Sequence, residues 1–427
     1  MTNFKEQAQN SPTFCIMPFT HIVTKTTGEF KLCCRSWPLY SVKDKSLLEV
    51  WNSEKYKRIR KQMLSGQRPE ECQTACYYLE DKNVRSMRER QNILLCEYGD
   101  YWKVLDEVQT DYSMPNIRSI ELKLNNLCNL KCRMCHPADS TQWARDWPLI
   151  ADMQKHNEWT YDSVEKYNLV ENPYICEWEN HPSFFEDLQE LAGKLDTIWF
   201  AGGEPLIDPM HYKILDSLKD KGSNIRLQYA TNLTKINFRG KSIIDYWRNF
   251  KGVLAGISFD GVGDVFNYIR TNADFDSVVA NIKTVKNIAE KESLDIGLIA
   301  ACTFQAYNIF DLPAIFNFVT DNKIWIHTHR VMYPRFLSCQ VLPQKLKRMV
   351  SENISQYLLD LEDKGLPLER YKNAKKNAID SLAFLNGDDL SHLWPDFLKY
   401  SKIIDEATGS RLLEEVRPEI KEYLNDK

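Results

Sequence analysis

Three cysteines in one short segment, Cys128, Cys132 and Cys135, constrain this chain more than any other feature of its sequence. Their spacing is C-x3-C-x2-C, and they follow residues 120–124, which alternate apolar and polar side chains as a half-buried strand does. Three thiolates on one tight loop can hold three irons of a four-iron cluster and leave the fourth iron open to a substrate or cofactor. A structural site would fill all of its metal positions. The spacing therefore indicates chemistry at this loop, although spacing alone also permits zinc.

The composition limits the remaining possibilities. The 427 residues suffice for two or three domains, and 43% hydrophobic with 27% charged residues is typical of a folded globular protein. The net charge of −4 argues against a large nucleic-acid footprint. Residues 1–12 are polar, and no apolar run approaches the ~20 residues that a membrane span needs, so we expect a cytoplasmic protein without membrane contact. The 12 cysteines are grouped tightly, which favours thiolate–metal chemistry over disulfides.

Residues 13–80 contain the second group of cysteines. A predicted hairpin has Cys15 before it and the pair Cys33-Cys34 after it. A predicted helix then leads to a loop with two further cysteines. The hairpin and the loop each supply two thiolates, which is enough to close one site; an iron–sulfur cluster, zinc and buried free cysteines are all compatible with this pattern. The candidate ligands are Cys15, Cys33 or Cys34, Cys72 and Cys76.

Residues 116–337 alternate between strand-like and helix-like segments. Repeated β–α units predict a parallel sheet with helices outside it, which can curl into a full or partial barrel. The functional site of such a fold lies at the C-terminal ends of the strands. The predicted strands are 120–124, 197–201, 225–230, 254–261, 295–303 and 323–331, and the predicted helices lie around 209–221, 275–291 and 311–320.

Three other regions have weaker signals. We expect residues 81–115 to form a charged helical connector whose arginines, including Arg88, lie on a solvated face. The insertion 138–186 is too long for a simple loop, and its tryptophans either cover a substrate or fill a small core. Residues 338–427 are amphipathic and helical in pattern, and we expect them to pack against the barrel or a partner. The tryptophans of the insertion are Trp143, Trp147, Trp159 and Trp178.

The cysteine loop and the motif Gly202-Gly203-Glu204-Pro205, which ends the next predicted strand, together resemble the radical S-adenosylmethionine (SAM) family. The resemblance extends over most of residues 118–310. It implies an α/β fold with a partial (β/α)6 TIM-like barrel, and a [4Fe–4S] cluster whose open iron is chelated by SAM. In this family, an electron from the reduced cluster cleaves SAM to a 5′-deoxyadenosyl radical, which abstracts a substrate hydrogen.

The resemblance also implies which residues contact SAM. The glycines let the backbone approach the SAM amino group, and Glu204 accepts a hydrogen bond from it. Arg270 resembles an arginine that pairs with the SAM carboxylate, a role that suits the planar guanidinium with its paired N–H donors. The competing interpretations are an ordinary turn at the glycines, a surface salt bridge at Arg270, and a role as caps or turn formers for Ser258 and Asp260. The implied SAM contacts are Met134, Gly202, Gly203, Glu204, Thr231, Asn232, Ser258, Asp260, Arg270 and Thr303.

Residues 13–80 resemble the SPASM/Twitch auxiliary-cluster domain, which implies a second [4Fe–4S] cluster. The last cysteine pair is C-x3-C where C-x2-C is usual, and the domain precedes the main domain where in most relatives it follows. The resembling positions are Cys15, Pro18, Gly28, Cys33-Cys34, Leu47, Trp51-Asn52-Ser53, Arg60, Gly66, Pro69, Cys72 and Cys76.

We therefore expect a radical SAM enzyme that modifies a peptide or protein side chain, with a reductase such as flavodoxin or ferredoxin as electron donor. The alternative is an enzyme that oxidises, dehydrogenates or isomerises a small molecule. A more remote alternative is a non-enzymatic iron–sulfur protein. His327 and His329 on the last predicted strand either line the substrate cavity or fill the barrel. Cys302 and Cys339 are buried cysteines in the simplest interpretation, and a hydrogen-atom donor in another.

Overall fold

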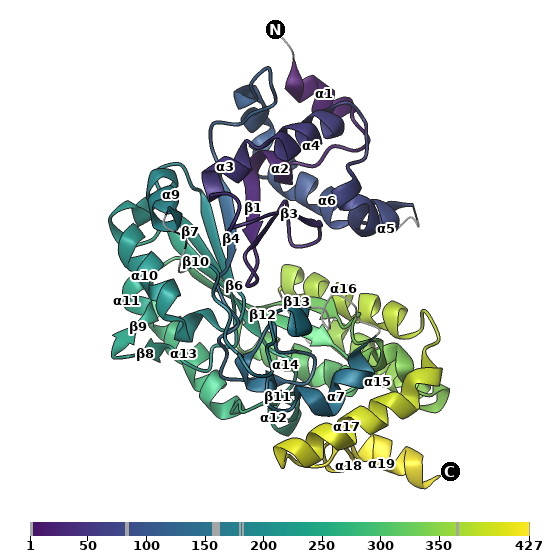
Figure 1. Cartoon of the computed structure of the whole chain (residues 1–427). Helices are drawn as coiled ribbons and strands as arrows, with labels where there is room; N and C mark the ends of the chain where they lie inside the picture. Colours follow the sequence, from purple (N-terminus) through teal and green to yellow (C-terminus); the bar gives the residue numbers. More distant parts are fainter. Residues whose placement is uncertain are drawn as a thin grey trace. The chain divides into compact units, whose positions relative to one another are not determined.

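The computed structural model describes residues 3–81, 85–155, 163–178, 181, 183–363 and 367–426 (Figure 1). Two compact units alternate along the chain. The first comprises Met1–Asn125, Cys176–Gln228 and Asp245–Val253, and the second comprises Asn126–Ile175, Tyr229–Ile244 and Leu254–Lys427. The segments β7 (Arg226–Thr231), α11 (Ile243–Trp247) and β10 (Gly252–Ser258) each contain a boundary between the two units.

The sheet of the first unit joins the cysteine hairpin to the predicted parallel strands. Its order is β3-β2-β1-β4-β6, and β1 is antiparallel to β2 but parallel to β4. Gly28 makes the hairpin turn with φ +81°, a backbone conformation that L side chains rarely adopt. The predicted hairpin is therefore confirmed. The strands are β1 (His21–Thr24), β2 (Glu29–Lys31), β3 (Pro38–Ser41), β4 (Ser119–Lys123) and β6 (Thr197–Ala201).

Two helices beside this hairpin are held by a buried arginine. Ser46 caps α3 through a complete capping box, and Ser53 caps α4. The guanidinium of Arg60 is fully buried and donates to the carbonyls of Pro18 and Trp51, at 2.8 and 2.9 Å. The helices of this unit are α1 (Phe4–Asn10), α2 (Met17–Thr20), α3 (Leu47–Trp51), α4 (Glu54–Leu64), α5 (Tyr78–Glu80), α6 (Met87–Gln91), α9 (Phe184–Leu191) and α10 (Pro209–Leu218).

The second unit contains the other parallel strands. β12 pairs in parallel with β13, and the amide of Phe259, just after β10, donates to the carbonyl of Ala301 at 2.9 Å. Helices α13 and α14 bury one apolar face each. The short strands β5 and β11 form a separate antiparallel pair, as do β8 and β9. These elements are β5 (Lys131–Cys132), β8 (Asn237–Phe238), β9 (Lys241–Ser242), α12 (Asp264–Ile269), β11 (Arg270–Thr271), α13 (Phe275–Glu292), β12 (Ile296–Phe304), α14 (Leu312–Asp321) and β13 (Trp325–Arg330).

The fold is α/β, as predicted, and the six predicted strands agree with the observed ones within three residues at either end. Within the described residues the strands do not close into a barrel. The C-terminal region is helical, as its pattern predicts, with α15 (Gln344–Asp363), α16 (Leu368–Leu385), α17 (Trp394–Thr408), α18 (Leu413–Val416) and α19 (Pro418–Asn425). No helix in the described part of the chain has the length and apolarity needed to cross a bilayer.

Some side chains lie where the sequence did not place them. His327 and His329 are both exposed on β13, so the expectation that they fill the interior of a barrel is wrong. Of the tryptophans in the insertion, Trp143, Trp147 and Trp178 are buried, whereas Trp159 lies outside the described residues. The described tryptophans therefore fill cores and do not form an exposed substrate surface.

Candidate functional site

The loop after β4 brings the three cysteines of the C-x3-C-x2-C motif together in the second unit. Cys128 and Cys132 are buried with Leu130, and Met134 and Cys135 pack against them. A hydrogen bond from Cys135 lowers the pKa of Cys132, and the charge of Arg270 lowers it further. Sulfur donors clustered in this way are the soft ligands that iron–sulfur clusters use. The donor set therefore fits a cluster held by three thiolates.

The segment after the loop fixes the loop's backbone. Ser140 donates to the carbonyl of Leu130 at 2.6 Å, and the indole of Trp143 donates to the carbonyl of Cys132 at 2.9 Å. Trp143 is fully buried. This tryptophan of the insertion therefore supports the cysteine loop directly.

A chain of amides joins the loop to the end of β7. The side chain of Asn232 donates to Asn129 at 3.0 Å, and Asn129 donates to Thr234 at 2.8 Å. Thr231 accepts instead from the amide of Leu233 at 3.0 Å, so its hydroxyl stabilises the local turn. Asn232 was expected from the sequence, but Asn129 was missed. Its position inside the cysteine motif, as an amide residue among ligands, was the available signal.

Arg270 lies beside the cysteines and is held by an acidic partner. One nitrogen of its guanidinium donates to the sulfur of Cys132 at 3.5 Å, and another pairs with Asp260 at 2.6 Å. Burial opposes the positive charge, yet Asp260 and the neighbouring thiols raise the pKa of Arg270. The ion pair is buried, so the competing interpretation of a surface salt bridge is wrong.

Asp260 connects this arginine to the next strand. Its carboxylate accepts from the amide of Thr303 at 2.7 Å, and its backbone carbonyl accepts from Asn308 at 2.9 Å. Burial raises the pKa of Asp260, whereas the ion pair with Arg270 lowers it. Ser258, the last residue of β10, is half-buried. Asp260 is itself completely buried, so its visible role is to orient Arg270.

The motif Gly202-Gly203-Glu204 belongs to the first unit and forms a tight turn. Gly202 has φ +114°, and a Cβ there would lie 2.9 Å from the carbonyl oxygen of Asn125. That same carbonyl accepts from the amide of Gly203 at 3.0 Å. Glu204 is buried, and its carboxylate accepts from the amide of Leu206 at 3.0 Å. The first glycine is therefore required by the turn itself, and Glu204 caps the segment that follows.

The N-terminal cysteines meet in a second place. Cys15, Cys33, Cys72 and Cys76 line one cavity of the first unit together with Met17 and Arg88. Burial raises the pKa of Cys33 to about 12, and it also raises the pKa of Cys15. Cys34 is exposed and contacts the sulfur of Met87 at 3.6 Å. The buried thiols of Cys15, Cys33 and Cys76 and the half-buried thiol of Cys72 surround one cavity, and four such donors fit a cluster with all of its iron positions filled.

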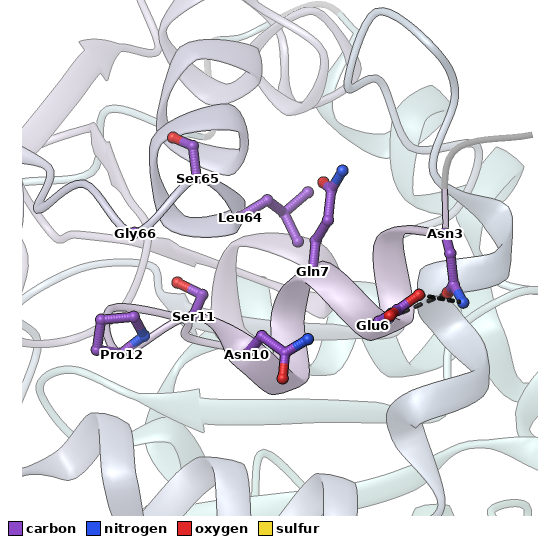
Figure 2. A pocket seen from close by; sticks show the side chains of 9 residues that line it. All are labelled: Asn3, Glu6, Gln7, Asn10, Ser11, Pro12, Leu64, Ser65 and Gly66. Atoms are coloured by element: carbon purple, nitrogen blue, oxygen red, sulfur yellow. Dashed lines mark hydrogen bonds between the residues drawn. The ribbon is translucent and has the colours of Figure 1, made fainter.

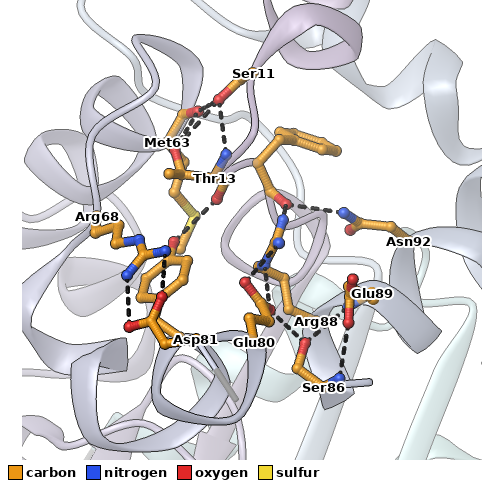
Figure 3. Close-up of polar contacts among 12 residues, drawn as sticks. Ser11, Thr13, Met63, Arg68, Glu80, Asp81, Ser86, Arg88, Glu89 and Asn92 are labelled. Atoms are coloured by element: carbon orange, nitrogen blue, oxygen red, sulfur yellow. Dashed lines mark hydrogen bonds and ion pairs between the residues drawn. The ribbon is translucent and has the colours of Figure 1, made fainter. Parts of the chain in front are cut away.

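Arg88 does not lie on a solvated face, as the sequence suggested. Its guanidinium forms two hydrogen bonds with the carboxylate of Glu80, at 2.9 and 2.8 Å, and donates to the carbonyl of Phe14 at 2.7 Å (Figure 3). Ser86 donates to the same carboxylate at 2.5 Å. The side chains of Arg88 and Glu80 are only 12% and 13% exposed. The connector therefore places Arg88, paired with Glu80, in the lining of the cysteine cavity. The composition of the connector alone did not indicate this buried ion pair.

A larger hollow of about 520 Å³ lies between α1 and the end of α4 (Figure 2). The residues that line it are Asn3, Glu6, Gln7, Asn10, Ser11, Pro12, Leu64, Ser65 and Gly66. This lining contains none of the residues predicted to bind metal or SAM.

Comparison with family models identifies two domains in the chain. The family model of the radical SAM superfamily matches residues 122–296, and that of the iron–sulfur cluster-binding SPASM domain matches residues 15–77. No curated protein matches the sequence.

Several solved structures are distantly similar. Native anSMEcpe with bound AdoMet (SAM) and Cp18Cys peptide is 15% identical, with a TM-score of 0.34 over 58% of this chain and 62% of that chain. Streptococcus suis SuiB bound to SAM is 15% identical, with a TM-score of 0.32 over 58% of this chain and 45% of that chain. SuiB bound to precursor peptide SuiA is 14% identical, with a TM-score of 0.33 over 74% of this chain and 61% of that chain. The chain thus spans less than two thirds of the length of each of these proteins.

The two matched domains define the cofactors. A radical SAM domain implies a [4Fe–4S] cluster with SAM, and a SPASM domain implies auxiliary iron–sulfur binding. Each match contains one of the two groups of clustered cysteines described above. The chain therefore contains a radical SAM domain, and a SPASM iron–sulfur cluster-binding domain precedes it.

Proposed function

We propose that this enzyme cleaves SAM reductively at a cluster held by Cys128, Cys132 and Cys135, and abstracts a hydrogen from a peptide or protein side chain. The observation that supports this most is the group of three cysteines with Arg270 donating to the sulfur of Cys132. When bound, the cluster and SAM supply a 5′-deoxyadenosyl radical. A peptide substrate is favoured over a small molecule because the SPASM-like region resembles that of peptide-maturing relatives.

The protein's own groups would bind and orient SAM. Arg270 is proposed to pair with the SAM carboxylate through its planar guanidinium, while Asp260 keeps that guanidinium in place. Three further residues are proposed to complete this part of the site: Met134, Ser258 and Thr303. Of these, Met134 packs against the cysteines. The buried ion pair supports the proposal because it presents the arginine in one defined orientation.

The turn at Gly202 and Gly203 is proposed to face the amino group of SAM. Glu204 is proposed to accept a hydrogen bond from that ammonium. Thr231 and Asn232 are proposed to lie beside the methionine moiety, and the bond from Asn232 to Asn129 supports a position next to the cysteine loop. A flavodoxin or ferredoxin is the proposed source of the electron.

We assign the auxiliary ligands to Cys15, Cys33, Cys72 and Cys76, with Cys33 preferred over Cys34. Cys33→Ser is expected to remove the auxiliary iron, about four of the eight irons that two cubane clusters contain. Cys34→Ser is the matched control and is expected to retain all of it, because Cys34 is exposed and does not line the cavity. Iron per chain and the visible absorbance after anaerobic reconstitution measure the difference. Iron loss in the Cys34 variant alone would reverse the assignment.

The Arg88–Glu80 pair is expected to set the reduction potential of the auxiliary cluster. A nearby positive charge favours the more negative reduced state, so Arg88→Gln should lower the potential and Glu80→Gln should raise it. Arg90→Gln, at an exposed position of the same helix, should leave the potential unchanged. A potentiometric titration followed by EPR measures all three variants. Shifts of the same sign at Arg88 and Glu80 would contradict this electrostatic account.

The substrate class is tested by an anaerobic assay with reduced, reconstituted enzyme. Pools of peptides and pools of small metabolites are incubated separately with SAM, and the 5′-deoxyadenosine formed and the mass change of each pool are measured. The proposal predicts that a peptide pool stimulates 5′-deoxyadenosine formation and contains a modified peptide. Stimulation by metabolites alone would replace it with the small-molecule alternative.

A further inference from the structure

Arg133, between the second and third cysteines of the radical SAM motif, is completely buried. Its backbone amide donates to the carbonyl of Ile269 at 2.9 Å, and its Nε donates to the carbonyl of Tyr268 at 2.8 Å. The guanidinium carbon lies 3.5 Å from the centre of the Tyr268 ring, which is cation–π contact. The side chain therefore points away from the cysteines and ties their loop to the segment that precedes Arg270.

The charge of Arg133 is paired with a residue 272 positions later in the chain. Asp405 of α17 accepts from the guanidinium at 2.5 Å, and its second oxygen accepts from the hydroxyl of Tyr268 at 3.2 Å and from the amide of Leu413 at 2.9 Å. Both side chains of the pair are at most 2% exposed. A buried carboxylate with this many donors holds its neighbours in one arrangement.

A second residue of α17 contacts the same loop. Tyr400 is fully buried, and its hydroxyl donates to the backbone carbonyl of Arg133 at 2.7 Å. Ser410, just after the helix, donates to Asp405 at 3.4 Å and accepts from Arg133 at 3.1 Å. Helix α17 lies outside both family matches, which end at residues 77 and 296. The cysteine loop is thus held by a part of the chain that neither domain contains.

We propose that α17 is a brace for the radical SAM cluster: Asp405 and Tyr400 are positioning residues that act through Arg133 to hold the Cys132–Cys135 segment. The inference rests on the proposed assignment of Cys128, Cys132 and Cys135 as cluster ligands. Tyr268 is only two residues before Arg270, so the brace also fixes the arginine proposed to bind SAM. Removing one partner of a buried ion pair leaves an uncompensated charge, and the loop that contains it must rearrange.

The test compares Tyr400→Phe and Asp405→Asn with Glu406→Gln, an exposed position of the same helix, in the full-length protein with both clusters reconstituted. Tyr400→Phe removes one hydroxyl and keeps the ring, so it serves if Asp405→Asn fails to fold. The first readout is the rate at which a chelator extracts iron, with the auxiliary cluster as internal reference. The second is the change that SAM causes in the EPR spectrum of the reduced protein.

If α17 is a brace, the α17 variants should lose about four irons at least tenfold faster, while the rate for the auxiliary irons stays unchanged. The response of their EPR spectrum to SAM should also be weaker. Equal rates in Tyr400→Phe, Asp405→Asn and Glu406→Gln would overturn the proposal, as would parallel loss of both clusters, which indicates general destabilisation. Its failure is distinct from failure of the proposed function. If the proposed function fails, the unmutated protein itself lacks iron at Cys128, Cys132 and Cys135.

Discussion

Replacing Cys128, Cys132 and Cys135 together by alanine is expected to abolish SAM cleavage while leaving about half of the iron. The unmutated, reconstituted protein should hold about eight irons, four per cluster, and the variant about four. The remaining iron is expected because the auxiliary cysteines lie in the first unit, around a cavity that contains none of the three replaced residues. Iron per chain and 5′-deoxyadenosine formed from SAM are the two measurements.

Cys339→Ala is the matched control for this variant. Cys339 is also fully buried in the second unit, but it does not belong to the buried cluster of Cys128, Leu130 and Cys132. The control should keep the full iron content and full SAM cleavage. Unchanged iron in the triple variant would refute the cluster assignment. Only about four irons in the unmutated protein would instead indicate zinc, or no metal, at Cys15, Cys33, Cys72 and Cys76.

Arg270→Lys is expected to weaken SAM binding strongly without removing the cluster. Lysine keeps the charge but loses the planar fork, so it cannot serve Asp260, the sulfur of Cys132 and a carboxylate together. Loss of one hydrogen bond to a charged group costs about 1.5–3 kcal/mol, which corresponds to roughly 10- to 150-fold in Kd. Equilibrium binding of SAM to the reconstituted protein measures this effect, and the iron content shows whether the cluster is retained.

Arg145→Lys provides the comparison, since Arg145 belongs to the same unit and its side chain is 84% exposed. SAM affinity should not change there. If Arg270→Lys bound SAM as tightly as the unmutated enzyme, Arg270 would not pair with the SAM carboxylate, and its role would be limited to the ion pair with Asp260.

The parts of the fold that sequence periodicity determines locally were predicted well. The strand at 197–201 and the helix at 275–291 have a regular apolar pattern, and the structure shows both within one residue. The two groups of cysteines could be recognised because each is confined to a short segment or a single hairpin and its following loop. Residues that act through local turns, such as Gly28 and Gly202, could be identified for the same reason.

Contacts between distant parts of the chain could not be predicted in this way. Nothing in the sequence near Asp405 indicates that its partner is Arg133, because the two are brought together only by tertiary packing. The charged composition around Arg88 predicted a side chain exposed to solvent. In the structure the side chain is instead paired with Glu80 and donates to the carbonyl of Phe14. The tryptophans of the insertion were compatible with a substrate surface and with a small core, because an indole serves equally well in either, and only the structure shows that Trp143 is buried.

The central claim is that SAM binds at a cluster held by Cys128, Cys132 and Cys135, and EPR of the reduced protein with and without SAM tests it most directly. The account predicts that SAM alters the spectrum of this cluster and leaves the signal of the auxiliary cluster unchanged. It also predicts that the triple alanine variant shows no response to SAM. A spectrum that SAM leaves unchanged in the fully reconstituted, unmutated protein would contradict the account.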